Sequence, residues 1–240
     1  MLKRPNVIIA ILSTILFILT AMYIVNNKDA IATLSGQLLN KEADKAGFRV
    51  VIDPGHGGID PGKVTMNGIS EKDINLEIAH KLRKFLEAQD VLVIMTREDD
   101  EGLYPANAAN KKVEDMKKRL NIIENAKADL AVSIHQNSFQ QEKIHGAQVF
   151  YFTTGKESKK LAETIQKQMI SSLDPNNTRV AKGNENYYLL KKTTIPIAII
   201  ECGFLSNNAE AKKLTEDYYQ EKVAWSIHLA ILQYLNQSSQ

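Results

Sequence analysis

Two histidines and two glutamates lie where apolar segments of the sequence end or where a helical segment begins. His56 follows the segment FRVVID within a turn that holds four glycines, and His135 closes the segment DLAVSIH. Glu201 follows IPIAII, and Glu71 stands near the start of a segment with helical periodicity. Two imidazoles and one carboxylate are a common ligand set for catalytic zinc, which keeps a further position for water. His56, Glu71 and His135 therefore indicate a site for one zinc ion per chain, although their spacing alone leaves metal binding open.

Glu201 is the candidate catalytic residue. Hydrolysis of an amide at a metal needs a second carboxylate, which takes a proton from water and returns it to the leaving nitrogen. A carboxylate at the end of a buried strand is costly without a partner, which favours a functional role for Glu201. Taken one at a time, the histidines are better explained as hydrogen-bonded surface or core residues, and Glu71 as an acid in the first turn of a helix. The occurrence of four such residues at one edge of the sheet is what favours a functional site.

Two further polar residues are candidates for supporting contacts at this site or with substrate. Asp53 either accepts a hydrogen bond from a ligand histidine or caps the turn that follows it. Asn137 lies two residues beyond His135 and shares its side of the strand if the strand continues. Both residues are therefore expected close to the metal ligands.

Two arginines and one loop are also expected beside the site. Arg97 and Arg119 are predicted to form structural ion pairs with nearby acids. The long polar segment 174–188 precedes the last predicted strand. We expect this segment to border the cleft and to contact the substrate.

The segments that must position these residues alternate between strands and helices. Apolar, β-branched runs predict strands, and apolar residues at spacings of three and four predict helices. This order indicates an α/β fold: a single-domain three-layer sandwich with a twisted, mostly parallel (mixed) sheet and helices on both faces. Ligands of such sheets bind beyond the carboxyl ends of the strands, where the four candidate residues are expected to meet. The predicted strands are 48–53, 90–97, 129–135, 146–152 and 195–204, and the predicted helices are 70–89, 111–128, 157–173 and 216–235.

The N-terminal part of the sequence differs from the remainder. Two basic residues precede the uncharged run 7–25, which as a helix would extend roughly 28 Å, close to the thickness of the hydrocarbon core of a bilayer. We expect a cytoplasmic N-terminus (1–6), a transmembrane anchor (7–25), a linker (26–47) and a catalytic domain (48–240) outside the cytoplasmic membrane. A cleaved signal peptide is the alternative.

The composition does not favour a nucleic-acid-binding protein. The net charge of the 240-residue chain is +2, too small to attract a polyanion strongly. The single cysteine, Cys202, excludes an internal disulfide. Because successive side chains of a strand point to opposite faces, Cys202 is expected to face away from Glu201, which argues against a thiol nucleophile.

Four motifs occur in the order VVIDPGHGGIDPG, GISEKDINL, SIHQNS and IPIAIIECGFLSN. In these motifs the chain resembles the zinc-dependent N-acetylmuramoyl-L-alanine amidases of the amidase-3 family, from about Phe48 to the C-terminus. The segments LVIMTRE, VEDMKKRLNIIENAKADL and GAQVFYF are similar to the germination-specific members of that family in spore-forming bacteria.

The resemblance implies zinc ligands at His56, Glu71 and His135 and a catalytic glutamate at Glu201. It implies hydrolysis of the amide bond between N-acetylmuramic acid and L-alanine in peptidoglycan, which removes stem peptides. The closer resemblance implies a role in spore cortex maturation, where muramic-δ-lactam formation is required for germination, and a catalytic domain facing the space between the forespore membranes. A regulatory or activating protein of unknown identity is also expected.

Two other kinds of function stay open from the residues alone. A cell-wall peptidase or deacetylase could use the same metal site on a different bond. A non-catalytic wall-binding scaffold would be expected to have lost one of the four central residues, and all four are present.

Overall fold

The computed structural model describes residues 9, 12–14, 16, 47–65 and 67–238 of the chain. The chain divides into two compact units, residues 1–46 and residues 47–240. Residues 1–6 and nearly all of the expected anchor (7–25) and linker (26–47) lie outside the described residues. Within the described ranges, no helix has both the length and the apolar character needed to cross a membrane.

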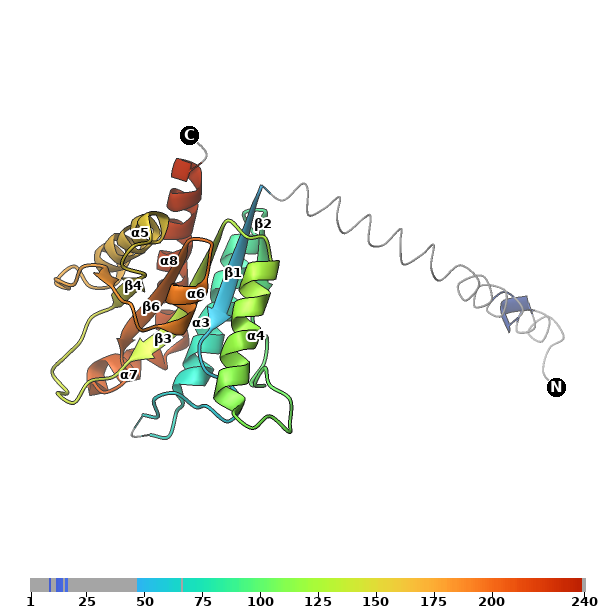
Figure 1. The fold of residues 1–240 in the computed structure, drawn as a ribbon, viewed down its shortest axis with the longest axis horizontal. Helices are drawn as coiled ribbons and strands as arrows, with labels where there is room; N and C mark the ends of the chain where they lie inside the picture. The colour runs from blue at the N-terminus through green and yellow to red at the C-terminus, as the bar shows by residue number, and fades with distance from the viewer. Residues whose placement is uncertain (1–8, 10–11, 15, 17–46, 66, 239–240) are drawn as a thin grey trace. The chain divides into compact units, whose positions relative to one another are not determined.

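The second unit is built on a six-stranded sheet. The strands are β1 (Phe48–Pro54), β2 (Val91–Met95), β3 (Leu130–Asn137), β4 (Gln148–Tyr151), β5 (Lys182–Gly183) and β6 (Ile197–Phe204). Their order across the sheet is β2-β1-β3-β6-β4-β5, and β2, β1, β3 and β6 run parallel (Figure 1). β4 pairs antiparallel with β6 and parallel with β5. The predicted mixed, mostly parallel sheet is therefore confirmed.

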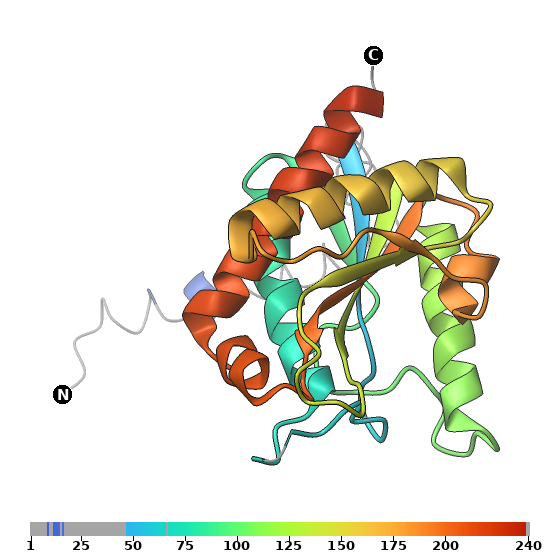
Figure 2. The ribbon, with the colours of Figure 1, turned by 90° about the vertical axis from the view of Figure 1, so that its left-hand side faces the viewer.

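Helices cover both faces of this sheet. They are α3 (Glu71–Glu87), α4 (Lys111–Asn125), α5 (Lys156–Leu173), α6 (Tyr188–Lys192), α7 (Asn208–Leu214) and α8 (Asp217–Ser238). α3, α5 and α8 lie on one face, and α4 and α6 lie on the other (Figure 2). The predicted three-layer α/β arrangement is therefore confirmed, with α6, α7 and the short edge strand β5 as elements that the sequence did not predict.

Alternation along the strands divides the core between the two faces. Val132 and Ile200 pack in the larger apolar cluster beneath α3, α5 and α8, whereas Ala131 and Ile199 pack in the smaller cluster beneath α4 and α6. This period of two follows from strand geometry. The parallel strands β1, β3 and β6 also bring their carboxyl ends to the same edge of the sheet, which is where the candidate site lies.

Candidate active site

His56 lies in the turn that follows β1. Its φ is +62°, and Gly57 and Gly58 follow with φ of +138° and +56°. A positive φ costs roughly 1–3 kcal/mol for a residue with a side chain, so the surroundings must hold His56 in this conformation. His56 Nδ1 lies 3.1 Å from Asp60 Oδ2. A carboxylate at this nitrogen fixes the imidazole tautomer and leaves Nε2 available to bind a metal.

Two glycines make room for the candidate ligands. A Cβ at Gly55 would lie 2.2 Å from His135 Cε1, and a Cβ at Gly62 would lie 2.5 Å from Glu71 Oε2. Contacts this short do not occur, so any other residue at either position would displace a ligand side chain. The glycines near His56 therefore let the ligands approach one another.

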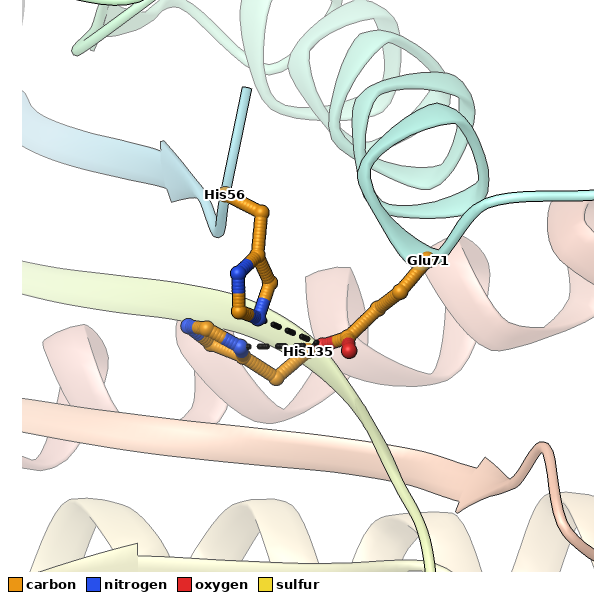
Figure 3. A group of neighbouring side chains, drawn as sticks. All are labelled: His56, Glu71 and His135. Atoms are coloured by element: carbon orange, nitrogen blue, oxygen red, sulfur yellow. Dashed lines mark hydrogen bonds and ion pairs between the residues drawn. The ribbon is translucent and has the colours of Figure 1, made fainter. Parts of the chain in front are cut away.

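His56, Glu71 and His135 converge at the carboxyl end of the sheet (Figure 3). Glu71 Oε1 lies 3.2 Å from His56 Nε2 and 3.1 Å from His135 Nδ1. One donor atom from each of the three residues lies within 4.8 Å of the other two. Around a tetrahedral zinc ion with bonds of about 2.0 Å, donor atoms lie about 3.3 Å apart. The three side chains therefore fit an ion of this size and preference.

Glu71 is the first residue of α3 and is buried. The Lys63 backbone N–H donates to its Oε2 at 2.8 Å, and the Gln136 backbone N–H donates to its Oε1 at 3.0 Å. Burial would raise the pKa of Glu71, but hydrogen bonds with His135 and His56 and their charges hold it well below its usual range. Glu71 is therefore an ionised carboxylate with a fixed orientation.

Glu201 faces the same group from β6. It is the register partner of His135 on the neighbouring strand β3 and is 7% exposed. Among the described residues, its Oε2 has no hydrogen-bond partner. Burial raises the pKa of Glu201 to about 7, an effect that the charge on His135 opposes and the charge on Glu71 increases. A carboxyl group with this pKa can accept and return a proton near neutral pH.

A cavity of about 370 Å³ opens beside these residues on the face of the sheet that carries α4 and α6. His56, His135 and Glu201 form part of its wall. Its apolar and aromatic wall includes Ile59, Tyr104, Met116, Tyr187, Tyr188 and Leu189. The prediction that segment 174–188 borders the cleft is confirmed for its last two residues.

Asp53 lies in a different hydrogen-bond network from either of the two predicted. It is buried and accepts hydrogen bonds from Thr96 Oγ1 at 2.6 Å, Ser133 Oγ at 2.6 Å and Arg119 Nη1 at 2.7 Å. In the described part of the chain, Asp53 has no bond to a ligand histidine. The reason is that α4 places the charged guanidinium of Arg119 beside the end of β1, where it is the stronger partner.

Asn137, predicted as a possible supporting or substrate contact, is not among the residues that line the cavity. The pairing of β3 with β6 shifts register between His135 and Asn137. This irregularity interrupts the simple alternation on which the prediction depended. The Asn137 side chain instead accepts a hydrogen bond from the Ser138 backbone N–H at 2.8 Å.

The two arginines near the site behave differently. Arg119 forms the predicted ion pairs, with Asp53 at 2.7 Å and Asp115 at 2.5 Å. Arg97 donates to backbone carbonyls and has no ion pair within the described residues. The prediction of an ion pair is therefore wrong for Arg97.

The sequence analysis did not single out Asp60 or Tyr187. Asp60 lies four residues after His56 in the same glycine-rich turn, a spacing that could have identified it as the partner of a ligand histidine. Burial raises the pKa of the Tyr187 phenol to about 12, and the charge of the neighbouring Glu201 adds to the rise. No periodic pattern marks Tyr187, because it precedes a helix of only one turn.

The comparisons with known proteins agree with this geometry. Residues 50–233 match the Amidase_3 family model, described as N-acetylmuramoyl-L-alanine amidase. The chain is 42% identical over 195 residues to the germination-specific N-acetylmuramoyl-L-alanine amidase of Bacillus subtilis, covering 80% of this chain and 81% of that protein.

The chain is also similar to solved structures of amidases. The CwlD amidase from Clostridioides difficile, determined in complex with the GerS lipoprotein, is 46% identical with a TM-score of 0.77 and covers 79% of this chain and 99% of that one. An N-acetylmuramoyl-L-alanine amidase from Clostridium difficile 630 is 33% identical with a TM-score of 0.70, covering 80% and 98%. This chain therefore belongs to the Amidase_3 family and is an N-acetylmuramoyl-L-alanine amidase that acts on peptidoglycan.

Proposed function

We propose that the chain hydrolyses the bond between N-acetylmuramic acid and L-alanine with one zinc ion held by His56, Glu71 and His135. The observation that carries this proposal is the placement of Glu201 opposite His135 in the β3–β6 register, beside three side chains with a zinc-type donor set. Zinc, when bound, supplies polarisation of the scissile carbonyl and acidifies a water molecule.

The residues of the chain account for the proton transfers. Glu201, with a pKa of about 7, accepts a proton from the attacking water through its carboxylate, and Oε2 is the oxygen without an internal partner. As the carbon–nitrogen bond breaks, Glu201 returns that proton to the leaving nitrogen of L-alanine. The products are a lactyl carboxylate on the glycan and a stem peptide with a free amino terminus.

The orientation of the ligands has its own basis in the structure. Asp60 accepts a hydrogen bond from His56 Nδ1–H, so the imidazole presents Nε2 to the metal. The backbone N–H groups of Lys63 and Gln136 hold the Glu71 carboxylate. The side chains are thus oriented before a metal binds, which reduces the cost of forming the site.

We further propose a role in spore cortex maturation, in which removal of whole stem peptides permits muramic-δ-lactam formation and later germination. Its support is the 42% identity with a germination-specific amidase. The uncharged run 7–25 supports an anchor in the membrane. The likeness to a germination-specific amidase supports a catalytic domain, residues 48–240, in the space between the forespore membranes. Because a related amidase was solved with a lipoprotein partner, we also propose that a protein partner regulates this chain.

Product analysis tests the proposed reaction. Purified peptidoglycan is incubated with zinc-loaded protein and with protein stripped by a chelator, and the released peptides are read by mass spectrometry. The proposal predicts intact stem peptides that begin with L-alanine, in the zinc-loaded sample alone. Cleavage between amino acids, or release of acetate, would contradict the assigned bond and favour the peptidase or deacetylase.

The cortex role needs a separate experiment. Spores from a strain lacking this gene are expected to contain cortex without muramic-δ-lactam and to fail to complete germination. Spores with normal muramic-δ-lactam would contradict the cortex role while leaving the amidase activity intact.

A further inference from the structure

The turn that presents His56 is held through its backbone by two buried guanidinium groups. The carbonyl of Pro54 accepts hydrogen bonds from Arg97 Nε at 3.0 Å and from Arg119 Nη1 at 2.7 Å. The carbonyl of Gly55 accepts from Arg97 Nη2 at 3.1 Å, and the carbonyl of His56 accepts from Arg119 Nη2 at 2.5 Å. Three successive carbonyls are therefore fixed at the point where the chain enters its positive-φ turn.

Arg97 is unusual among buried arginines because it has no carboxylate partner in the described part of the chain. It lies just beyond β2 and is 4% exposed. Burial and the neighbouring charge of Arg119 lower the pKa of Arg97 to about 10. The charges of Asp53, Asp100 and Asp115 oppose this lowering, but none of these carboxylates forms an ion pair with Arg97. A buried charge without a directly paired countercharge is costly, so this placement calls for a specific role.

The bonds of Arg97 connect the chain neighbours of two metal ligands. Its Nη2 donates both to the Gly55 carbonyl at 3.1 Å and to the Lys72 carbonyl at 2.8 Å. Gly55 precedes His56, and Lys72 follows Glu71. One nitrogen atom thus fixes the backbone beside His56 relative to the backbone beside Glu71.

Arg97 also packs directly against the turn. A Cβ at Gly57 would lie 3.0 Å from Arg97 Cδ and Nε, so the arginine stem fills the space beneath this residue. Arg97 does not line the cavity, whereas Arg119 does. Arg97 can therefore affect the site through the ligands and not through contact with substrate.

We propose that Arg97 is a positioning residue that sets the separation of His56 and Glu71 and thereby the affinity of the site for zinc. Arg119 supports the same turn from α4. The inference rests on the zinc site of the proposed function. Lysine cannot replace Arg97, because a single ammonium group lacks the planar set of donors that reaches four carbonyls at once.

Zinc affinity tests this inference directly. The full chain and its Arg97→Lys variant are stripped of metal and titrated with zinc against a chromogenic chelator, at a temperature where near-ultraviolet circular dichroism shows both to be folded. We expect the zinc affinity of Arg97→Lys to fall about 10–100-fold, as for other residues that orient metal ligands. The matched control is Arg83→Lys on α3, where the arginine pairs with Glu87 and Glu98 and zinc affinity is expected to stay unchanged.

Three outcomes of the zinc titration would overturn the inference about Arg97. A folded Arg97→Lys variant with wild-type zinc affinity would overturn the inference, even if its melting temperature falls. If Arg97→Lys does not fold, Arg119→Lys is titrated with zinc in the same way. Wild-type zinc affinity of Arg119→Lys would then overturn the inference, and so would failure of both variants to fold. A wild-type chain that binds no zinc refutes the proposed zinc site together with this inference, whereas an unaffected variant beside a zinc-binding wild type refutes the inference alone.

Discussion

The two faces of the sheet carry apolar cores of different size. α3, α5 and α8 bury a large continuous cluster against one face, whereas α4 and α6 bury a smaller cluster against the other. The cavity beside His135 and Glu201 opens on the second face. Where the helical cover is smaller, buried polar groups and a cavity occupy the space that apolar side chains fill on the other side.

Two adjacent residues of β6 show the same contrast. Glu201 faces the cavity and is the candidate proton carrier, while Cys202 points into the larger cluster. Burial raises the pKa of the Cys202 thiol far above its usual range, so it stays protonated. Two consecutive residues of β6 therefore serve different purposes: Glu201 faces the site and Cys202 packs in the core. The predicted orientation of Cys202 away from the site is confirmed.

The largest expected effect is the loss of turnover in Glu201→Gln. Because the amide cannot accept a proton, kcat on peptidoglycan should fall about 10²–10⁴-fold, while zinc content is retained. The matched control is Cys202→Ala on the other face, which should keep kcat within about twofold because alanine removes only a buried thiol that takes no part in the chemistry. If kcat of Glu201→Gln stays within tenfold of wild type, Glu201 is not the proton carrier and does not differ in role from Cys202.

The larger core should carry more of the packing energy. Ile78→Ala in α3 truncates a side chain with no exposed surface, and it should lower the free energy of unfolding by about 2–5 kcal/mol. Urea denaturation measures this loss. Turnover per folded molecule should stay unchanged at low temperature, and a parallel loss of turnover would show that the two faces are not independent.

On the face that carries the cavity, buried ion pairs should contribute to the free energy of unfolding, whereas on the other face apolar packing should contribute most of it. Burial opposes ionisation of Asp53, but Arg119 and the hydroxyls of Ser133 and Thr96 hold its pKa below the usual range. A lowered folded-state pKa stabilises the protein above the unfolded-state pKa of about 3.9, and this contribution disappears as pH falls through the folded-state value. Asp53→Asn should therefore cost about 3 kcal/mol at pH 7.

Urea denaturation at pH 7 and near pH 3 separates the two mechanisms. The cost of Asp53→Asn should shrink near pH 3, which lies below the unfolded-state pKa of about 3.9, because the unfolded wild-type chain is then protonated at Asp53 and part of the stabilisation is lost. The cost of Ile78→Ala should stay constant, since no titrating group is removed. Equal pH dependence of the two variants would contradict a charge-based contribution from Asp53.

The smallest effect concerns the acid behind His56. Asp60→Asn weakens the acceptor at Nδ1, so zinc affinity should fall about 10-fold, and chelator competition measures it. Asp129→Asn is the control, because Asp129 lies just before β3, at the other end of the strands, and accepts from the Arg49 backbone N–H at 2.7 Å. If both variants bind zinc equally well, Asp60 does not orient the ligand.

The sequence predicted the sheet and the meeting of four residues because both follow from strand order. Parallel strands end at one edge, so His56, His135 and Glu201 had to lie near one another once their strands were recognised. The partner of Asp53 was not predictable in this way, since it depends on how α4 lies over β1. The register shift between His135 and Asn137 was not predictable either, because it has no signature in the sequence.

Zinc-edge anomalous diffraction from zinc-loaded crystals tests the central claim most directly. We predict a single strong anomalous peak within about 2.0–2.2 Å of His56 Nε2, His135 Nδ1 and a Glu71 oxygen, with Glu201 nearby but not bonded to the ion. A peak ligated by Glu201 or Asp60 in place of Glu71, or a peak elsewhere in the molecule, would contradict the division of the site into three ligands and one proton carrier.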